Sequence, residues 1–379
     1  MQKRIRVVSA GIVLVILLIG IIVINNNSNN KYSFTQDGIR YALTLDGEKT
    51  TSFPSKGMYK AQVTCVGADG RWLYDDWKLA IENITSDDVT CDIKFETIPK
   101  TYLNDYIISL LESEQGTGKV VNENGYRYEG KNPNNYIWFN NEYWRIIGVF
   151  DSASHGVSGK NLVKIIRADL LDGLSWHKSN TNDWTASSLK SLLNGAYYNA
   201  QDGTSSEYCY GYSTTATANC DYRKKGIQAG YRGMIANVTW YLGGYPTPSL
   251  TAKAFYGYER GTTVYSGRPT STTGYIGLMY PSDYGYSVLA SSCARTTILS
   301  SYNTATCAGQ SWLYGKGFEW TLTHFSSHSY RVFFLDISGA LASTTAYDGR
   351  GSRPVLYLDA SVYKIDGDGS LNNPYIVGM

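Results

Sequence analysis

The longest apolar run of the chain lies near its N-terminus, from Val7 to Ile24, and none of its residues carries a charge. A bilayer span needs roughly 17–25 such residues, so the run predicts a transmembrane anchor helix. Lys3, Arg4 and Arg6 precede it and predict a cytoplasmic N-terminus with the rest of the chain outside. A cleaved signal peptide is the alternative. The missing small-x-small site and the polar stretch that follows favour an uncleaved anchor, so residues 1–30 are expected to form a cytoplasmic stub, anchor and linker.

Residues 31–100 contain short stretches in which apolar and polar residues alternate. Gly, Asp and Ser separate these stretches, which read "IRYALTL", "MYKAQVTCVG", "WKLAIENI" and "TCDIKFETI". Alternation with a period of two is typical of half-buried strands. The pattern predicts a small antiparallel, Ig-like β-sandwich that acts as a spacer or adhesion domain.

The periodicity changes to that of a helix at Thr101 to Glu114. Leu103, Ile107, Leu110 and Leu111 recur at helical spacing there, and a stretch rich in Gly and Asn follows. Residues 101–118 are therefore expected to form a helix and a linker, with a domain boundary near Lys119.

Residues 119–379 show strand and helix patterns together. Asn140-Asn141 predicts a turn between two strands. "DWTASSLKSLLNGAYYN" predicts a helix capped by Asp183. A second helix is expected within Arg232 to Tyr245, with Met234, Val238 and Leu242 on one face.

The cysteines agree with an extracellular location. Six cysteines can pair in many ways, and local pairs are favoured because each pair falls inside one apparent structural unit. A metal site is the alternative, but the sequence has no CxxC and no histidine within a few positions of a cysteine. Disulfides form in oxidising compartments, in line with the predicted topology. The predicted pairs are Cys65 with Cys91, Cys209 with Cys220, and Cys293 with Cys307.

The charge of the chain gives no support for nucleic-acid binding. The sequence has 34 Lys and Arg against 32 Asp and Glu, and without the three basic residues before the apolar run the numbers are 31 and 32. No basic run with interleaved aromatic residues remains. Nucleic acid is therefore not an expected partner.

Five segments resemble, in order, parts of uncharacterised bacterial cell-surface proteins with a C-type-lectin-like domain, the fold of formylglycine-generating enzymes and phage receptor-binding tips. The resemblance covers roughly Asn135 to Asp359 and implies a lectin-like domain over 119–379 with a C-terminal tail. The expected fold class is α+β, with a membrane-anchor helix, a small β-sandwich and then the lectin-like domain. The segments are "YIWFNNEYWRIIGVFD", "DWTASSLKSLLN", "GLMYPSDYGYS", "EWTLT" and "GALAST…GRGSRPVLYLD".

The Arg-Pro pair in the last of these segments predicts a structural role. Pro354 at the first residue of a strand removes no ladder hydrogen bond. Arg353 can satisfy several carbonyls or a carboxylate with its fork of donors. The resemblance implies that the strand after this pair returns to the sheet near the N-terminal strands of the domain.

Candidate catalytic and metal patterns are incomplete. His324 and His328 have the spacing of a metal pair on a helix, but they precede a strand and have no Glu beside them. The Gly-rich motif expected before the closing strand of formylglycine-generating enzymes is absent, as is GxSxG. Asp366 begins a stretch like a calcium loop, yet Leu371 and Val377 replace its Gly and Glu. No cofactor and no metal are expected.

The 33 tyrosines, mixed with Ser, Gly, Thr and Asn, resemble the composition of a binding surface. The alternative is that Tyr simply suits exposed β structure. The loops from Tyr256 to Tyr286 and from His324 to Arg350 are the candidates for recognition. Their candidate ligand-binding residues are Tyr258, Tyr265, Tyr275, Tyr284, Trp320, His324, His328, Tyr330, Arg331, Tyr347 and Arg350.

These patterns together predict a single-pass, disulfide-bonded bacterial surface protein that is not an enzyme. Its lectin-like domain is expected to bind a cell-surface, glycan or protein ligand in adhesion or envelope binding. An enzyme acting on envelope polymers and a purely structural surface component are the alternatives.

Overall fold

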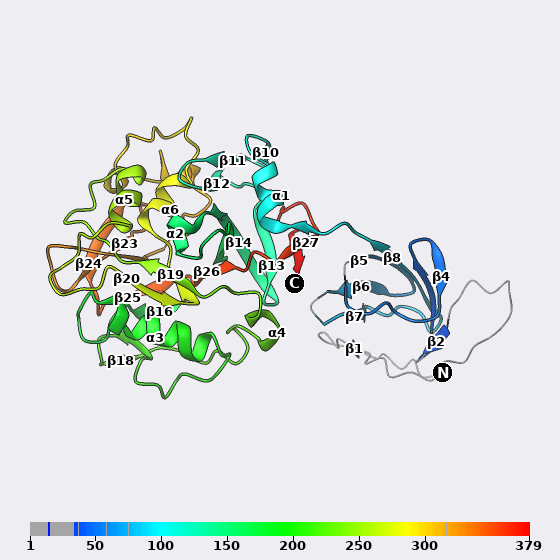
Figure 1. The fold of residues 1–379 in the computed structure, drawn as a ribbon. Coiled ribbons are helices and arrows are strands. Elements are labelled where there is room, and N and C mark those ends of the chain that lie inside the picture. The colour runs from blue at the N-terminus through cyan, green and yellow to red at the C-terminus, as the bar shows by residue number, and fades with distance from the viewer. Residues whose placement is uncertain (1–13, 16–33, 37, 58, 75, 316) are drawn as a thin grey trace. The chain divides into compact units, whose positions relative to one another are not determined.

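The computed structural model describes residues 14–15, 34–36, 38–57, 59–74, 76–315 and 317–379 (Figure 1). The chain divides into two compact units, the first ending at Lys100 and the second beginning at Thr101. Each unit has its own hydrophobic core.

Two sheets enclose the core of the first unit. One contains β2 (Phe34–Gln36), β3 (Ile39–Leu45), β8 (Val89–Thr97) and β5 (Tyr59–Val66) in that order, with β4 (Glu48–Thr50) on β3. The other contains β1 (Leu14–Val15), β7 (Lys78–Glu82) and β6 (Asp69–Leu73). Side chains of β8 alternate between buried and partly exposed, as a strand with one face on a core requires. Contrary to the antiparallel prediction, β3 and β8 run parallel.

An eleven-stranded sheet forms the centre of the second unit. Its strands β14 (Glu142–Phe150) and β15 (Leu162–Arg167) are buried almost throughout, which explains their near-continuous apolar sequences. The predicted turn at Asn140-Asn141 is confirmed, because both residues have positive φ in the hairpin between β13 and β14. The other strands of this sheet are β9 (Thr101–Tyr102), β10 (Glu114–Gln115), β11 (Gly118–Asn122), β12 (Tyr126–Gly130), β13 (Tyr136–Phe139), β21 (Ile276–Gly277), β26 (Val355–Leu358), β27 (Tyr363–Asp366) and β28 (Tyr375–Gly378).

A five-stranded sheet and two short ribbons complete the strands of this unit. The five-stranded sheet has the order β16 (Leu171–Ser175), β25 (Gly349–Ser352), β22 (Glu319–His324), β23 (Arg331–Leu335) and β24 (Leu341–Thr345). The ribbons pair β17 (Tyr210–Tyr212) with β18 (Ala216–Thr217), and β19 (Val238–Tyr241) with β20 (Ser271–Gly274).

The helices of the second unit are short. The predicted second helix is wrong: α4 ends at Arg232, and Val238 and Trp240 lie on strand β19 with alternating burial. Asp183 does cap a helical turn, since its carboxylate accepts a hydrogen bond from the Thr185 amide. The helical segments are α1 (Leu103–Ser109), α2 (Ser152–His155), η1 (Trp184–Ala186), α3 (Ser188–Leu192), η2 (Leu193–Tyr197), α4 (Ala229–Arg232), α5 (Ala252–Glu259), α6 (Pro281–Tyr286), η3 (Leu299–Ser301) and η4 (Ala308–Gln310).

The predicted α+β fold class with an anchor helix is wrong, because the structure is mostly β, with 39% strand and 14% helix. Most of the predicted anchor, residues 7–24, lies outside the described residues, and Leu14 and Val15 form β1, which pairs with β7. Within the part of the chain that is described, no helix has the length and apolar character of a membrane span.

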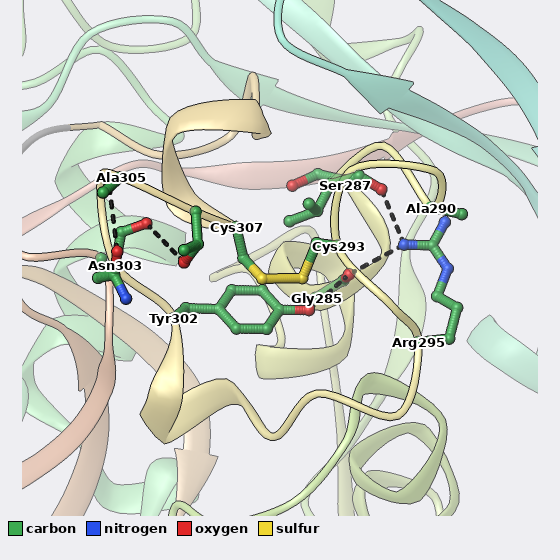
Figure 2. The surroundings of a disulfide bond; sticks show 12 residues. Gly285, Ser287, Ala290, Cys293, Arg295, Tyr302, Asn303, Ala305 and Cys307 are labelled. Carbon is green, nitrogen blue, oxygen red and sulfur yellow. Dashed lines mark hydrogen bonds between the residues drawn. A yellow bond between two sulfur atoms is a disulfide. The ribbon is translucent and has the colours of Figure 1, made fainter.

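The structure contains the three local disulfides that the spacing predicts, Cys65–Cys91, Cys209–Cys220 and Cys293–Cys307. Cys65 and Cys91 lie directly opposite each other on neighbouring strands β5 and β8, so this bond joins two strands of one sheet and does not link the two sheets of the first unit. Figure 2 shows the Cys293–Cys307 bond beside Tyr302. The hydroxyl of Tyr302 and the guanidinium of Arg295 both donate to the Gly285 carbonyl, at 3.4 and 3.5 Å, and so tie this loop to α6.

Removing the Cys293–Cys307 bond should destabilise the second unit by about 2–3 kcal/mol, because the bond restricts the unfolded chain. The comparison is between the parent chain and a variant with both residues changed to Ser, unfolded in guanidinium. As a control, Ser291→Ala in the same exposed loop should change the free energy of unfolding by less than about 0.5 kcal/mol. Equal unfolding midpoints for the parent and the double variant would contradict this role.

The Arg-Pro pair before the closing strand has a structural role, as predicted. Arg353 Nε and Nη2 each donate to the Glu319 carboxylate at 2.7 Å, and Nη2 also reaches the Leu313 carbonyl. Strand β26 starts directly after Pro354 and pairs with β15 and β21. Arg353 and Pro354 thus connect Glu319 of the five-stranded sheet to the start of strand β26 in the eleven-stranded sheet.

Candidate functional site

Exposed and half-buried side chains from three segments, most of them aromatic, lie on one surface of the second unit. We call this the tyrosine–histidine surface and define it as Tyr245, Tyr258, Tyr265, Arg268, His328 and Tyr330. Tyr245 follows β19, and its ring lies 4.3 Å from that of Tyr258 on α5. The Tyr245 carbonyl accepts a hydrogen bond from the Ser326 amide at 3.2 Å, which connects it to the turn after β22.

The turn between β22 and β23 carries the second part of this surface. The ring of His328 lies 5.8 Å from that of Phe325 and 5.7 Å from that of Tyr330. The guanidinium of Arg331 lies 5.5 Å from the centre of the Phe325 ring and donates a hydrogen bond to the Ser343 carbonyl. Phe325 and Arg331 therefore pack against the body of the unit, while His328 and Tyr330 remain accessible.

Asn182 holds the backbone of this turn. Its Nδ2 atom lies 2.9, 2.6 and 3.1 Å from the carbonyl oxygens of Phe325, His328 and Arg331. The side chain is buried, so losing these contacts would leave buried carbonyls without a partner. Asn182 was not among the predicted site residues. Only its position directly before the capping residue Asp183 could have indicated a structural role from the sequence.

Arg268 links the turn to the segment that carries Tyr265. Its Nε donates to Asn182 Oδ1 at 3.2 Å, and its Nη2 donates to the Ser329 carbonyl at 3.2 Å. The guanidinium lies 3.9 Å from the Asp183 carboxylate and 5.6 Å from the centre of the Tyr265 ring. Arg268 was not predicted either, although it lies between the tyrosines of a candidate loop.

His324 lies beneath the surface at the end of β22. Burial, helped by the nearby positive charge of Arg268, lowers the pKa of His324 to about 4, although the Asp183 carboxylate opposes this shift. The imidazole is therefore neutral at pH 7. Gly244 allows this packing, because a Cβ there would lie only 2.4 Å from the His324 carbonyl oxygen.

Of the eleven predicted ligand-binding residues, six come together here: Tyr258, Tyr265, His324, His328, Tyr330 and Arg331. Tyr284 and Trp320 are buried and belong to the core. Tyr275 stacks on Tyr198, with ring centres 4.4 Å apart. Tyr347 contacts Tyr212, and Arg350 lies over the rings of Phe318 and Phe334.

A groove of about 650 Å³ adjoins Tyr258. The groove is wide open to solvent, whereas small-ligand sites of roughly 300–1,000 Å³ enclose most of their ligand. Its walls offer hydroxyl groups, one amine and one aromatic ring. They are formed by Thr251, Lys253, Ala254, Gly257, Tyr258, Gly261, Thr262 and Thr263. A smaller hollow of about 300 Å³ lies on the first unit, on the solvent face of β5 and β8.

The tyrosine–histidine surface and the adjoining groove offer both apolar area and hydrogen-bonding groups. Tyrosine rings supply apolar area with a polar tip, and threonine hydroxyls and Arg268 supply hydrogen bonds. In the part of the chain described, no group of three or more His, Cys, Asp and Glu side chains is placed to hold a metal ion.

No family model, no curated protein and no solved structure matches the chain. The resemblance to bacterial surface proteins therefore stays a prediction, and the case for function depends on the site itself.

Proposed function

We propose that the chain is an extracellular recognition protein that binds a cell-envelope glycan through the tyrosine–histidine surface and the adjoining groove, without altering its ligand chemically. The three disulfides fit an extracellular protein. The observation that carries the proposal is the group of exposed or half-buried rings on and beside a turn whose backbone Asn182 and Arg268 hold. A recognition surface needs such support, because a ligand that must first order a loop loses affinity.

A glycan fits the chemistry of the site better than a flat protein partner does. The apolar faces of sugar rings can stack on Tyr258, and sugar hydroxyls can bond to Thr262 and Thr263 in the groove. Lys253 and Arg268 are the cations of the site, so the proposal favours a neutral or acidic glycan over a basic one.

Changing Tyr258 and Tyr330 to Ala should weaken binding by about thirtyfold or more, because aromatic anchors of this kind contribute about 1–2 kcal/mol each. The labelled full chain, made under oxidising conditions, is titrated against purified cell walls and a glycan panel, with and without EDTA. Both residues are exposed, so the variant should keep the parent's circular dichroism.

Tyr212→Ala is the matched control, because Tyr212 is an exposed tyrosine that contacts Tyr347 and belongs neither to the tyrosine–histidine surface nor to the groove. It should bind like the parent. Failure of the parent to bind any glycan, or equal affinity of the parent and the double variant, would overturn the proposal. Binding to a protein on intact cells alone would show that the ligand class is wrong.

A further inference from the structure

A group of charged side chains lies deep in the second unit, apart from the tyrosine–histidine surface. We call it the buried cationic cluster: Lys164, Arg127, Arg260, Asp283 and Glu259. Its members come from β15, β12 and helices α5 and α6 with their ends, so the fold brings together residues far apart in the sequence. Lys164, Arg127 and the two carboxylates are at most 1% exposed, and the side chain of Arg260 is 11% exposed.

The two carboxylates are fully used by neighbours. Asp283 accepts from Lys164 Nζ at 2.5 Å, from Arg127 Nη1 at 3.0 Å and from the Tyr280 amide at 2.9 Å. Glu259 accepts from the amide and hydroxyl of Ser282 and from Arg260 Nη1. Three cations thus face two anions within the cluster. Arg295 with Glu123 and Glu129 forms a separate ion-pair group beyond Tyr286.

Several donors in the cluster have no partner among the described residues: Arg260 Nε, Arg260 Nη2, Arg127 Nη2 and the Tyr357 hydroxyl. Nε and Nη2 form one edge of a guanidinium. Elsewhere in this protein that edge binds a carboxylate in bidentate fashion, in Arg353 with Glu319 and in Arg167 with Glu142. In Arg260 the same edge is buried and unpaired, which costs free energy unless something else binds it.

The two guanidiniums with unpaired donors both lie beside one side chain, Tyr256. Arg260 lies over the Tyr256 ring at 3.6 Å and Arg127 lies 5.7 Å from its centre. The ring of Tyr357 lies 5.6 Å from Lys164 Nζ and 6.2 Å from the ring of Phe150, over which Arg127 also lies at 4.5 Å. Tyr256 itself is half-buried and forms the outer wall of the cluster, where its hydroxyl bonds to Ser154 at 2.8 Å.

We propose that the buried cationic cluster is a binding site for one small monovalent anion, held by the Nε–Nη2 edge of Arg260 with Arg127 Nη2 and the Tyr357 hydroxyl. The anion offsets the excess positive charge and accepts hydrogen bonds from the buried donors. Its chemical class is a formate-sized carboxylate or a halide, because the site is enclosed by large aromatic side chains.

The test measures the thermal midpoint of the full chain in sodium formate, sodium bromide and sodium gluconate at equal ionic strength. Binding to the folded state alone should raise the midpoint and saturate with concentration. A saturable rise in formate or bromide, compared with gluconate, supports the site. A rise in formate alone identifies a planar carboxylate as the ligand, whereas a rise in both salts identifies a general monovalent anion site.

Two variants assign the effect to this cluster. Arg260→Lys keeps the charge but loses the bidentate edge, and it should abolish the anion-dependent rise. Tyr357→Phe removes one unpaired hydroxyl and should increase the concentration for half-maximal effect by about two- to tenfold. Tyr197→Phe is the control, because its buried hydroxyl also has no partner among the described residues but lies near Glu142 and Arg167 instead. Equal midpoints in the three salts, or a rise that persists unchanged in both variants, would overturn the proposal.

Discussion

Replacing Asp283 with asparagine should destabilise the second unit by about 3–5 kcal/mol, because it leaves two buried cations without their anion. Burial by itself raises the pKa of Asp283, but the charges of Lys164 and Arg127 outweigh it and bring the pKa to about 2. Burial in turn lowers the pKa of Lys164 to about 8, despite the Asp283 carboxylate. The carboxylate is therefore ionised at neutral pH and compensates charges that water cannot reach.

The measurement is guanidinium unfolding of the parent and the Asp283→Asn variant at pH 7. Glu112→Gln is the control, since Glu112 forms a 2.6 Å ion pair with Lys119 in which both side chains are exposed. Exposed pairs contribute about 0–1 kcal/mol, so this change should have little effect. A loss below about 1 kcal/mol for Asp283→Asn would show that the buried cations are not held as described.

Lowering the pH from 6.5 to 4 should destabilise the second unit by roughly 3 kcal/mol through His324 alone. The pKa of His324 falls from its ordinary value of 6.5 to about 4 in the folded chain. The unfolded chain therefore binds more protons in this window. Stability is therefore lost progressively from about pH 6.5, where the unfolded chain begins to bind the proton, and the loss levels off below about pH 4, where the folded chain binds it as well. Burial also lowers the pKa values of His155 and His177, which adds to the effect.

The first unit provides a control inside the same chain, because it contains no histidine. Unfolding free energies measured between pH 7 and 4 should fall for the second unit and change much less for the first. His324→Gln should remove most of the slope of the second unit. An unchanged slope in that variant would contradict the assignment to His324.

The strands that the sequence predicted well are those whose apolar pattern is local. β14 and β15 are buried along their length, and the Asn140-Asn141 turn needs only residues that tolerate positive φ. A helix was wrongly predicted between Arg232 and Tyr245, because Met234, Val238 and Leu242 recur at helical spacing. With Trp240 included, the same apolar positions alternate as they do in a strand. Helix α6 was missed because its sequence, "PSDYGY", has low helix propensity, and buried contacts of Asp283 hold it in place.

The candidate site was only partly predictable, because several of its contacts join residues that lie far apart in the sequence. Composition pointed to the tyrosine-rich loops, and six of the proposed residues do meet. Asn182 lies 143 positions from Phe325, whose carbonyl it contacts, and Lys164 lies 119 positions from Asp283. Such contacts depend on the fold, and no local sequence pattern predicts them.

Hydrogen exchange of the full chain, measured with and without the best-binding glycan, shows whether the glycan binds at the tyrosine–histidine surface. The ligand should slow exchange in the segments around Tyr245, Tyr258 to Arg268, and His324 to Arg331, and should leave the ribbon of β17 and β18 unchanged. Protection confined to that ribbon and to Tyr347 to Arg350, or protection of neither region despite saturating ligand, would contradict it.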